Sequence, residues 1–479
     1  MRKSSNPKIN LPSQHDMARR RKKTTQVSPP PADIKRPGRF SGGLIVSVII
    51  TLILAGIPFA LGKHIEFNSP GPFDSGAFVY SAKHLLNGAQ WGVEEQSSAR
   101  PNTLLANVVG VRLFGFNETG PKAVQMILQL GALGFMFYTL RKVFGPVASV
   151  VGTTVAAIYL SAPLIAKFGN VKEQFMIPLM IAAACCFLLY GYSSKRFWLI
   201  LSGFFALQPY YFKPTGLSIV IALGISIIAG NALSKKPKQL ALELGLFLAG
   251  YTAGLLVPGS LYIWQGLLSS LLRTLPVVML EAGLLFGVVV FGIAAVIVLI
   301  KRYQLIMQLR HVSKWIPIAG LCLIFIALAA AAAMIKKEPG SEDSDIVSYF
   351  YDIPLVSFPR RLYFMADTQI SKLLAATGLS GGYVANSWKA IGIADLAPKV
   401  FRYYKALSVP ILLAMASVIA AVWVWVRRLK IKTPPEDIQS KLVWMLAVWW
   451  MIDIAFVWGS PRSYEQYYLP LCASGAMLG

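Results

Sequence analysis

The sequence contains little charge and particularly little acid. Only 14% of its 479 residues are charged, and Asp and Glu together number 21. An average soluble domain carries about 25% charged residues. The low charge excludes an ordinary soluble enzyme, and a hydrophobic content of 55% excludes a disordered or collagen-like chain.

Cysteine is also scarce, and its positions exclude the usual cysteine chemistry. Cys185, Cys186, Cys322 and Cys472 all lie inside apolar segments, where thiols behave as small hydrophobic groups. Their spacing does not match a zinc site. We therefore expect neither a disulfide framework nor a cysteine-bound metal.

Long apolar runs are what the sequence has in abundance. Residues 43–62 and 276–300 carry at most one charge each, and an α-helix of about 20 such residues crosses a bilayer. The pattern predicts an all-α integral membrane protein with about 11–12 transmembrane helices. The predicted spans are 43–62, 121–140, 146–165, 174–192, 197–212, 214–231, 239–258, 276–300, 315–335, 406–426 and 442–458, followed by an apolar stretch that ends at Gly479 and is too short to span.

The net charge of +25 is concentrated at one end of the chain. Residues 1–40 hold eleven Lys or Arg and two Asp, among many Ser and Pro. We predict that residues 1–41 form a disordered, basic, cytoplasmic tail that sets the topology and contacts anionic lipid, or binds a specific partner. Because the other basic clusters separate apolar runs on one predicted side, the pattern does not indicate nucleic-acid binding.

The same topology divides the membrane domain, 42–479, into spans and two long outside loops. The first loop, 63–120, contains amphipathic segments expected to lie along the membrane surface. The second loop, 336–405, carries the acidic run SEDSD, which is either a solvated loop or a divalent-metal site. The final apolar stretch is interpreted as a truncated span.

Asp74 is the leading candidate for chemistry. It follows the first span closely and precedes a helical pattern in the first outside loop. One interpretation is a plain helix N-cap. The other is a carboxylate at the membrane surface that accepts a proton from an attacking group.

The first outside loop resembles that of the GT-C glycosyltransferases. Asp74 and Tyr80 are followed by LLNGAQW, by Arg100 and Pro101, and by NVVGVRLFGFNETGPK, with RKVFGPVAS after the next span. The resemblance is narrower to protein O-mannosyltransferases and lipid A aminoarabinose transferases. Ser75 departs from that pattern, since it stands at the usual second acidic position.

Later phrases extend the resemblance over most of the chain. GNVKEQFMIP supplies Lys172 and Glu173, YFKPTGLSIV supplies Lys213, and SPRSYEQYYLP supplies Arg462, Glu465 and Tyr467. The resemblance implies a donor-phosphate site made by Lys213, Arg462 and Lys172. It implies accessory or acceptor roles for the following residues: Glu173, Tyr80, Arg100, Glu465 and Tyr467.

Each helper residue also has a purely structural interpretation. A lysine at a helix end commonly extends toward lipid headgroups. Glu173 can pair with Lys172, and Arg462 can pair with Glu465 three residues later.

The resemblance implies an enzyme that moves a sugar from a polyprenyl-phosphate donor to a lipid, glycan or protein acceptor. Asp74 would be the base, cations would stabilise the leaving phosphate, and the anomeric centre would be inverted. No cofactor is certain, although a divalent metal would be compatible. We expect a bacterial inner-membrane protein with a cytoplasmic N-terminus and an outward-facing site. One alternative is a transporter or flippase of lipid-linked sugars, which Asp453 favours because it lies within a predicted span. Another is a non-catalytic assembly or scaffold protein, against which the pattern of the first loop counts.

Overall fold

The computed structural model describes residues 42–97, 99–233, 237–267, 407–431, 438–459 and 465–479. Its internal contacts divide the chain after Val46. The larger unit begins at Ser47 and contains every described residue except 42–46.

The described residues confirm the prediction of an all-α integral membrane fold. They form helices and turns, with one isolated bridge between Trp91 and Glu95. Five helices are long and apolar enough to cross a membrane. These are Gly42–Phe67, Thr119–Val143, Lys172–Ser193, Pro214–Asn231 and Pro237–Trp264.

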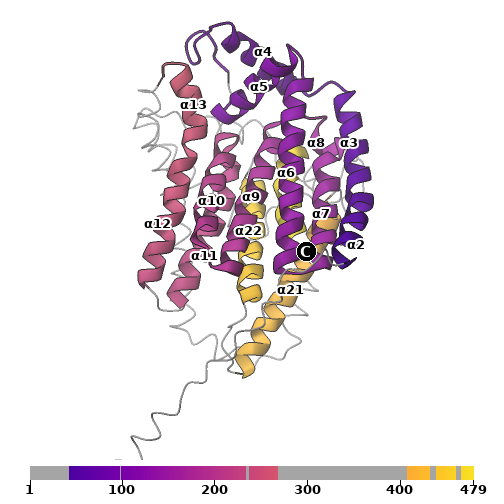
Figure 1. The fold of residues 1–479 in the computed structure, drawn as a ribbon, viewed down its shortest axis with the longest axis vertical. Coiled ribbons are helices and arrows are strands. Elements are labelled where there is room, and N and C mark those ends of the chain that lie inside the picture. Colours follow the sequence, from indigo (N-terminus) through magenta and orange to yellow (C-terminus); the bar gives the residue numbers. More distant parts are fainter. Residues whose placement is uncertain (1–41, 98, 234–236, 268–406, 432–437, 460–464) are drawn as a thin grey trace, which may run out of the picture. The chain divides into compact units, whose positions relative to one another are not determined.

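Most predicted spans correspond to helices in Figure 1. The spans at 276–300 and 315–335, the tail 1–41 and the loop 336–405 lie outside the described residues. The helices are α2 (Gly42–Thr51), α3 (Ile57–Phe67), α4 (Phe73–Leu86), α5 (Pro101–Phe114), α6 (Thr119–Val143), α7 (Pro146–Ser161), α8 (Pro163–Ala166), α9 (Lys172–Ser193), α10 (Arg196–Leu207), α11 (Leu217–Leu233), α12 (Pro237–Gly254), α13 (Leu256–Trp264), α21 (Ser408–Ile431), α22 (Ile438–Gly459) and α23 (Leu469–Leu478). A π-helical segment, η1 (Leu52–Gly56), joins α2 to α3, and the short 3-10 helices are η2 (Gln208–Tyr211), η3 (Pro214–Gly216) and η4 (Glu465–Tyr468).

Helix α9 forms the centre of the hydrophobic core. Its side chains from Phe175 to Leu189 are buried almost without interruption, and α6, α10, α22 and α23 pack against it. Beside it, α10 and α12 approach closely through glycine. A Cβ on Gly203 or Gly250 would clash with a backbone oxygen of the other helix, so only glycine permits this approach.

Helix α3 extends beyond the predicted first span. That span was predicted to end at residue 62, whereas α3 continues to Phe67. The helix continues because Lys63 and Glu66 are buried and paired with each other, so these polar residues do not terminate it.

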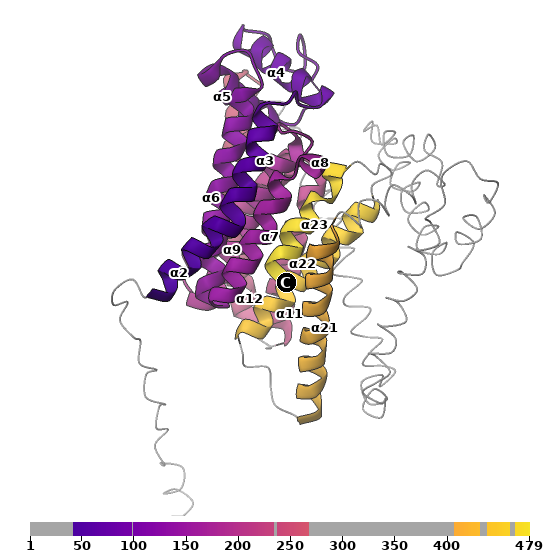
Figure 2. The same ribbon diagram turned by 90° about the vertical axis from the view of Figure 1, so that its right-hand side faces the viewer.

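Two helices, α4 and α5, make up most of the first loop. They pack against each other and lie at one end of the helical bundle in both views (Figures 1 and 2). Phe78, Ala82 and Leu85 face the buried side of α4, whereas Phe73 and Tyr80 are exposed. These are the predicted amphipathic helices.

Candidate functional site

Asp74 lies in the first turn of α4. The helix begins after Pro72, whose extended backbone occupies the cap position. The prediction that Asp74 could be the N-cap is therefore wrong. Its side chain is exposed to solvent, and the dipole at a helix N-terminus favours a negative charge there.

Lys172 and Glu173 begin α9, and Lys172 extends toward the first loop. The Lys172 ammonium lies 5.1 Å from the centroid of the Phe78 ring in α4. The charges of Asp74, Glu173 and Arg100 all act on this ammonium. Two segments about a hundred residues apart in sequence thus bring Asp74 and Lys172 into one electrostatic environment.

Lys213 joins the same group from the turn between η2 and η3. Its backbone is extended because Pro214 follows it. Its Nζ donates a hydrogen bond to Glu173 Oε1 at 2.5 Å and lies 3.0 Å from the centroid of the Tyr467 ring. Burial lowers the pKa of Lys213, while the carboxylates of Glu173 and Asp74 act in the opposite direction.

Arg100 occupies a neighbouring position at the start of α5. Its guanidinium lies 4.6 Å from the centroid of the Tyr210 ring, and Nη1 donates to the Tyr210 carbonyl oxygen at 3.2 Å. Stacking and the hydrogen bond fix the guanidinium beside η2. This leaves Arg100 close enough for its charge to act on Lys172.

Three other predicted site residues are not brought into this group by the described contacts. Tyr80 is 59% exposed and its ring pairs with His84. Six residues after Asp74, it lies about 120° away around the helix. Arg462 lies outside the described residues, and the side chain of Glu465 in η4 does too.

We name the group formed by Asp74, Lys172, Glu173, Lys213 and Tyr467 the outer cluster. It contains two carboxylates and two ammonium groups, and Asp74 is the exposed carboxylate. Ammonium groups of this kind can bind a phosphate through charge-assisted hydrogen bonds. An exposed carboxylate beside them can accept a proton from an incoming group.

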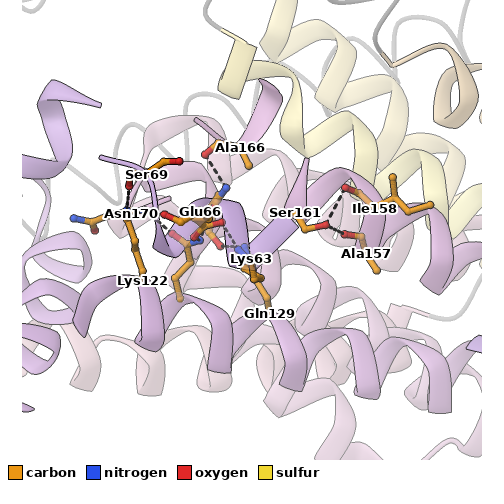
Figure 3. Close-up of polar contacts among 12 residues, drawn as sticks. Lys63, Glu66, Ser69, Lys122, Gln129, Ala157, Ile158, Ser161, Ala166 and Asn170 are labelled. Atoms are coloured by element: carbon orange, nitrogen blue, oxygen red, sulfur yellow. Dashed lines mark hydrogen bonds and ion pairs between the residues drawn. The ribbon is translucent and has the colours of Figure 1, made fainter. Parts of the chain in front are cut away.

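A second polar group is buried among the helices and was not predicted. This buried network consists of Lys63, Glu66, Lys122, Gln125, Asn170 and Gln174, and part of it is drawn in Figure 3.

Its charged core is compact and buried. Lys63 Nζ donates to Glu66 Oε2 at 2.6 Å. Lys122 Nζ donates to the carbonyl oxygens of Glu66 and Ser69 at 2.9 and 2.7 Å. The three charged side chains are at most 4% exposed. A signal was present in the sequence, since polar residues in apolar spans usually have partners inside the protein.

Glu118 connects this network to the loop that precedes α4. Its Oε2 accepts a hydrogen bond from the Gly71 amide at 2.7 Å and pairs with Lys122 at 3.3 Å. Burial acts to raise the pKa of Glu118, but hydrogen bonds from Ser75 and Gly71 and the Lys122 charge outweigh it. The pKa is therefore lowered.

Asp453 links two helices within the bundle. Its Oδ1 accepts a hydrogen bond from Ser218 Oγ at 2.5 Å, which joins α22 to α11. The side chain is buried. One oxygen of the Asp453 carboxylate therefore has a hydrogen-bond partner on a packed neighbouring helix.

No group of three His, Cys, Asp or Glu suited to a metal ion occurs within the described ranges. The acidic run at 341–345 lies outside them.

Comparisons with known proteins add a likeness among solved structures. No protein-family model and no curated protein sequence matches the chain. It is similar to oligosaccharyltransferase AglB from Archaeoglobus fulgidus in complex with an inhibitory peptide and a dolichol-phosphate, at 14% identity and a TM-score of 0.44. That match covers 91% of this chain and 49% of AglB, so the chain spans about half the length of AglB.

It is also similar to ArnT from Cupriavidus metallidurans bound to undecaprenyl phosphate. Identity is 14% and the TM-score is 0.35, over 91% of this chain and 77% of ArnT. At TM-scores below 0.5, these likenesses do not assign a function to this chain.

Proposed function

We propose that the protein transfers a sugar from a polyprenyl-phosphate donor to a lipid, glycan or protein acceptor. Transfer takes place at the outer membrane face, where α4 and the start of α9 form the outer cluster. The observation that carries the proposal is the convergence of Asp74, Lys172, Glu173 and Lys213 from three separate segments. The resemblance had singled out these same four residues.

The cations of the outer cluster suit a leaving phosphate. Lys213 is 15% exposed and Lys172 is partly buried, so both ammonium groups act where solvent screens charge poorly. Tyr467 and Glu173 hold Lys213 in place before the donor arrives. A phosphate on an isoprenoid chain can reach this position from the lipid phase while the sugar projects toward Asp74.

Asp74 is proposed as the base. The acceptor hydroxyl or amine gives its proton to the Asp74 carboxylate as its oxygen or nitrogen bonds to the anomeric carbon. The bond from that carbon to the phosphate oxygen breaks, and the electron pair leaves with the polyprenyl phosphate. Attack on the face opposite the phosphate inverts the anomeric centre.

The direct test is a transfer assay with purified protein in proteoliposomes. A panel of polyprenyl-phosphate sugars is offered together with lipid, glycan and peptide acceptors, with and without a chelator. We expect a glycosylated acceptor and free polyprenyl phosphate in equal amounts from at least one donor. Absence of transfer from every donor would contradict the proposal.

The same vesicles also test the transporter alternative. Donor initially confined to one leaflet becomes accessible to a membrane-impermeant reagent if the protein moves it across. Movement of intact donor without formation of a glycosylated product would favour a flippase. Product formation without movement would favour the transferase.

A further inference from the structure

The start of α4 and the start of α9, which carry the proposed reactive groups, are both connected to the buried network. Asp74 is followed by Ser75, and Lys172 and Glu173 lie between Asn170 and Gln174. Ser75, Asn170 and Gln174 are fully buried and hydrogen-bonded. The proposed reactive groups are thus attached to the buried network through their neighbours in sequence.

Asn170 is the residue at which these attachments meet. Its Nδ2 donates to Ser75 Oγ in α4 and to Asn107 Oδ1 in α5, both at 2.9 Å. Its backbone amide donates to Gln125 Oε1 in α6 at 2.8 Å. One asparagine therefore connects the segment before α9 to three other helices.

The backbone around Asn170 is held in an uncommon conformation. Residues Lys167, Phe168, Gly169 and Asn170 all have φ between 51° and 89°, the left-handed region. Asparagine tolerates this region better than most residues. A Cβ on Gly169 would lie 2.3 Å from Glu66 Oε1, so this turn also fits closely against the charged core of the network.

Gln125, which accepts the hydrogen bond from the Asn170 backbone amide, is itself held in place. Gln125 Nε2 donates to Glu66 Oε1 at 2.7 Å and also to Gln174 Oε1. Gln174 Nε2 donates to the carbonyl oxygen of Ala166 at 2.8 Å. The turn before α9 and the first residues of α9 are therefore held to α3 and α6 as one unit.

We propose that Asn170 is a positioning residue that aligns Asp74 with Lys172 and Glu173. This inference rests on the proposed function. Asn170 does not touch the reacting atoms; it ties the start of α4 to the start of α9, so that the base and the phosphate-binding cations keep one separation. Ser75, at the position where the resembled enzymes carry a second acid, serves as the acceptor for this connection.

The test compares Asn170→Gly with Asn231→Ala. Glycine preserves the left-handed backbone while removing the carboxamide. Asn231 is a matched control because it is also buried and its Nδ2 also makes two hydrogen bonds, to Ile227 and Glu243, but within the α11–α12 region. Hydrogen exchange and transfer kinetics are measured on both full-length variants.

We expect Asn170→Gly to increase backbone exchange in residues 68–78 and to lower kcat at least tenfold, with the donor KM changed less than threefold. Asn231→Ala should leave both exchange in 68–78 and kcat near the wild-type values. If Asn170→Gly does not fold, Ser75→Ala replaces it as the test variant. Ser75→Ala removes the acceptor of the Asn170 hydrogen bond, and it should increase exchange in residues 68–78 and lower kcat in the same way.

Unchanged exchange in residues 68–78 would overturn the inference, whatever the activity. Increased exchange with a wild-type kcat would overturn the positioning role while leaving the proposed function intact. An inactive wild-type protein would instead contradict the proposed function, and the exchange measurement would still decide whether Asn170 anchors α4.

Discussion

The outer cluster and the buried network contain the same kinds of side chain in different environments. In the network, Lys63, Glu66 and Lys122 are at most 4% exposed, and each makes a hydrogen bond within the protein. In the outer cluster, Asp74 is exposed and Lys213 rests on an aromatic ring. The network uses its charges to hold helices together, whereas the proposed function has the outer cluster offer its exposed carboxylate, Asp74, to an incoming acceptor.

This difference shows why residue type alone does not identify a functional group. A carboxylate whose oxygens are occupied by buried donors is already committed to the fold, as Glu66 is. A carboxylate at an exposed helix N-terminus can exchange protons with a substrate. Activity should therefore respond to changes in the outer cluster, and stability to changes in the network.

The largest expected effect is on turnover in Asp74→Asn. Loss of a general base lowers rates by about 10²–10⁴-fold, whereas loss of this exposed charge from the first turn of α4 should lower thermal stability only slightly. The matched control is Glu94→Gln, which removes another exposed carboxylate from the same loop. Normal turnover in Asp74→Asn would remove Asp74 from the mechanism.

The next largest effect is on stability in Glu66→Ala. This change leaves Lys63 buried without its carboxylate, and breaking a buried ion pair costs about 3–5 kcal/mol. Unfolding of the solubilised protein measures the loss. The double variant Lys63→Met with Glu66→Gln removes both charges and should recover part of it. If Glu66→Ala unfolds like the wild type, the network does not stabilise the bundle.

A smaller effect is expected on donor binding in Lys213→Gln. Glutamine retains a donor toward Glu173 but removes the charge, and a hydrogen bond to a charged group contributes about 1.5–3 kcal/mol. The donor KM should rise about tenfold to a hundredfold. Lys83→Gln, an exposed lysine on α4, serves as control. An unchanged donor KM would exclude Lys213 from the phosphate site.

The same lysine predicts a pH effect. Because burial lowers the pKa of Lys213 below the ordinary 10.5, the ammonium loses its proton at a lower pH than an exposed lysine does. Donor affinity should therefore decline as the pH rises, beginning below 10.5, and Lys213→Arg should extend the binding range upward. A donor KM that does not vary on the alkaline side would argue against this role.

The smallest expected effect concerns acid stability. The pKa of Glu118 is lowered in the folded protein, so the folded state binds this proton less readily than the unfolded state. The resulting stability is present above the ordinary Glu pKa of 4.5 and is lost as the pH falls through the lowered folded value. Glu118→Gln should flatten that part of the unfolding profile. An unaltered slope would show that Glu118 does not contribute.

Much of the fold followed from the sequence, while the network did not. Apolar runs predicted helices α6, α9 and α12, because about 20 apolar residues suffice to specify a span. Helix α3 runs past the predicted end of the first span because distant segments, Gln125 in α6 and Gly169 before α9, bury the Lys63–Glu66 pair. The order of motifs along the chain pointed to Asp74, Lys172 and Lys213. That order does not give the distances between their side chains in the folded protein.

The sequence by itself determined the helical membrane class and the candidate residues, because hydrophobic length and charge placement are properties of local composition. Only the tertiary structure decided which charges are paired within the protein and which are exposed. Glu66 and Asp74 are eight residues apart, and one is 1% exposed while the other faces solvent. Their different environments arise from contacts with α6 and the turn before α9, which distant segments of the chain supply.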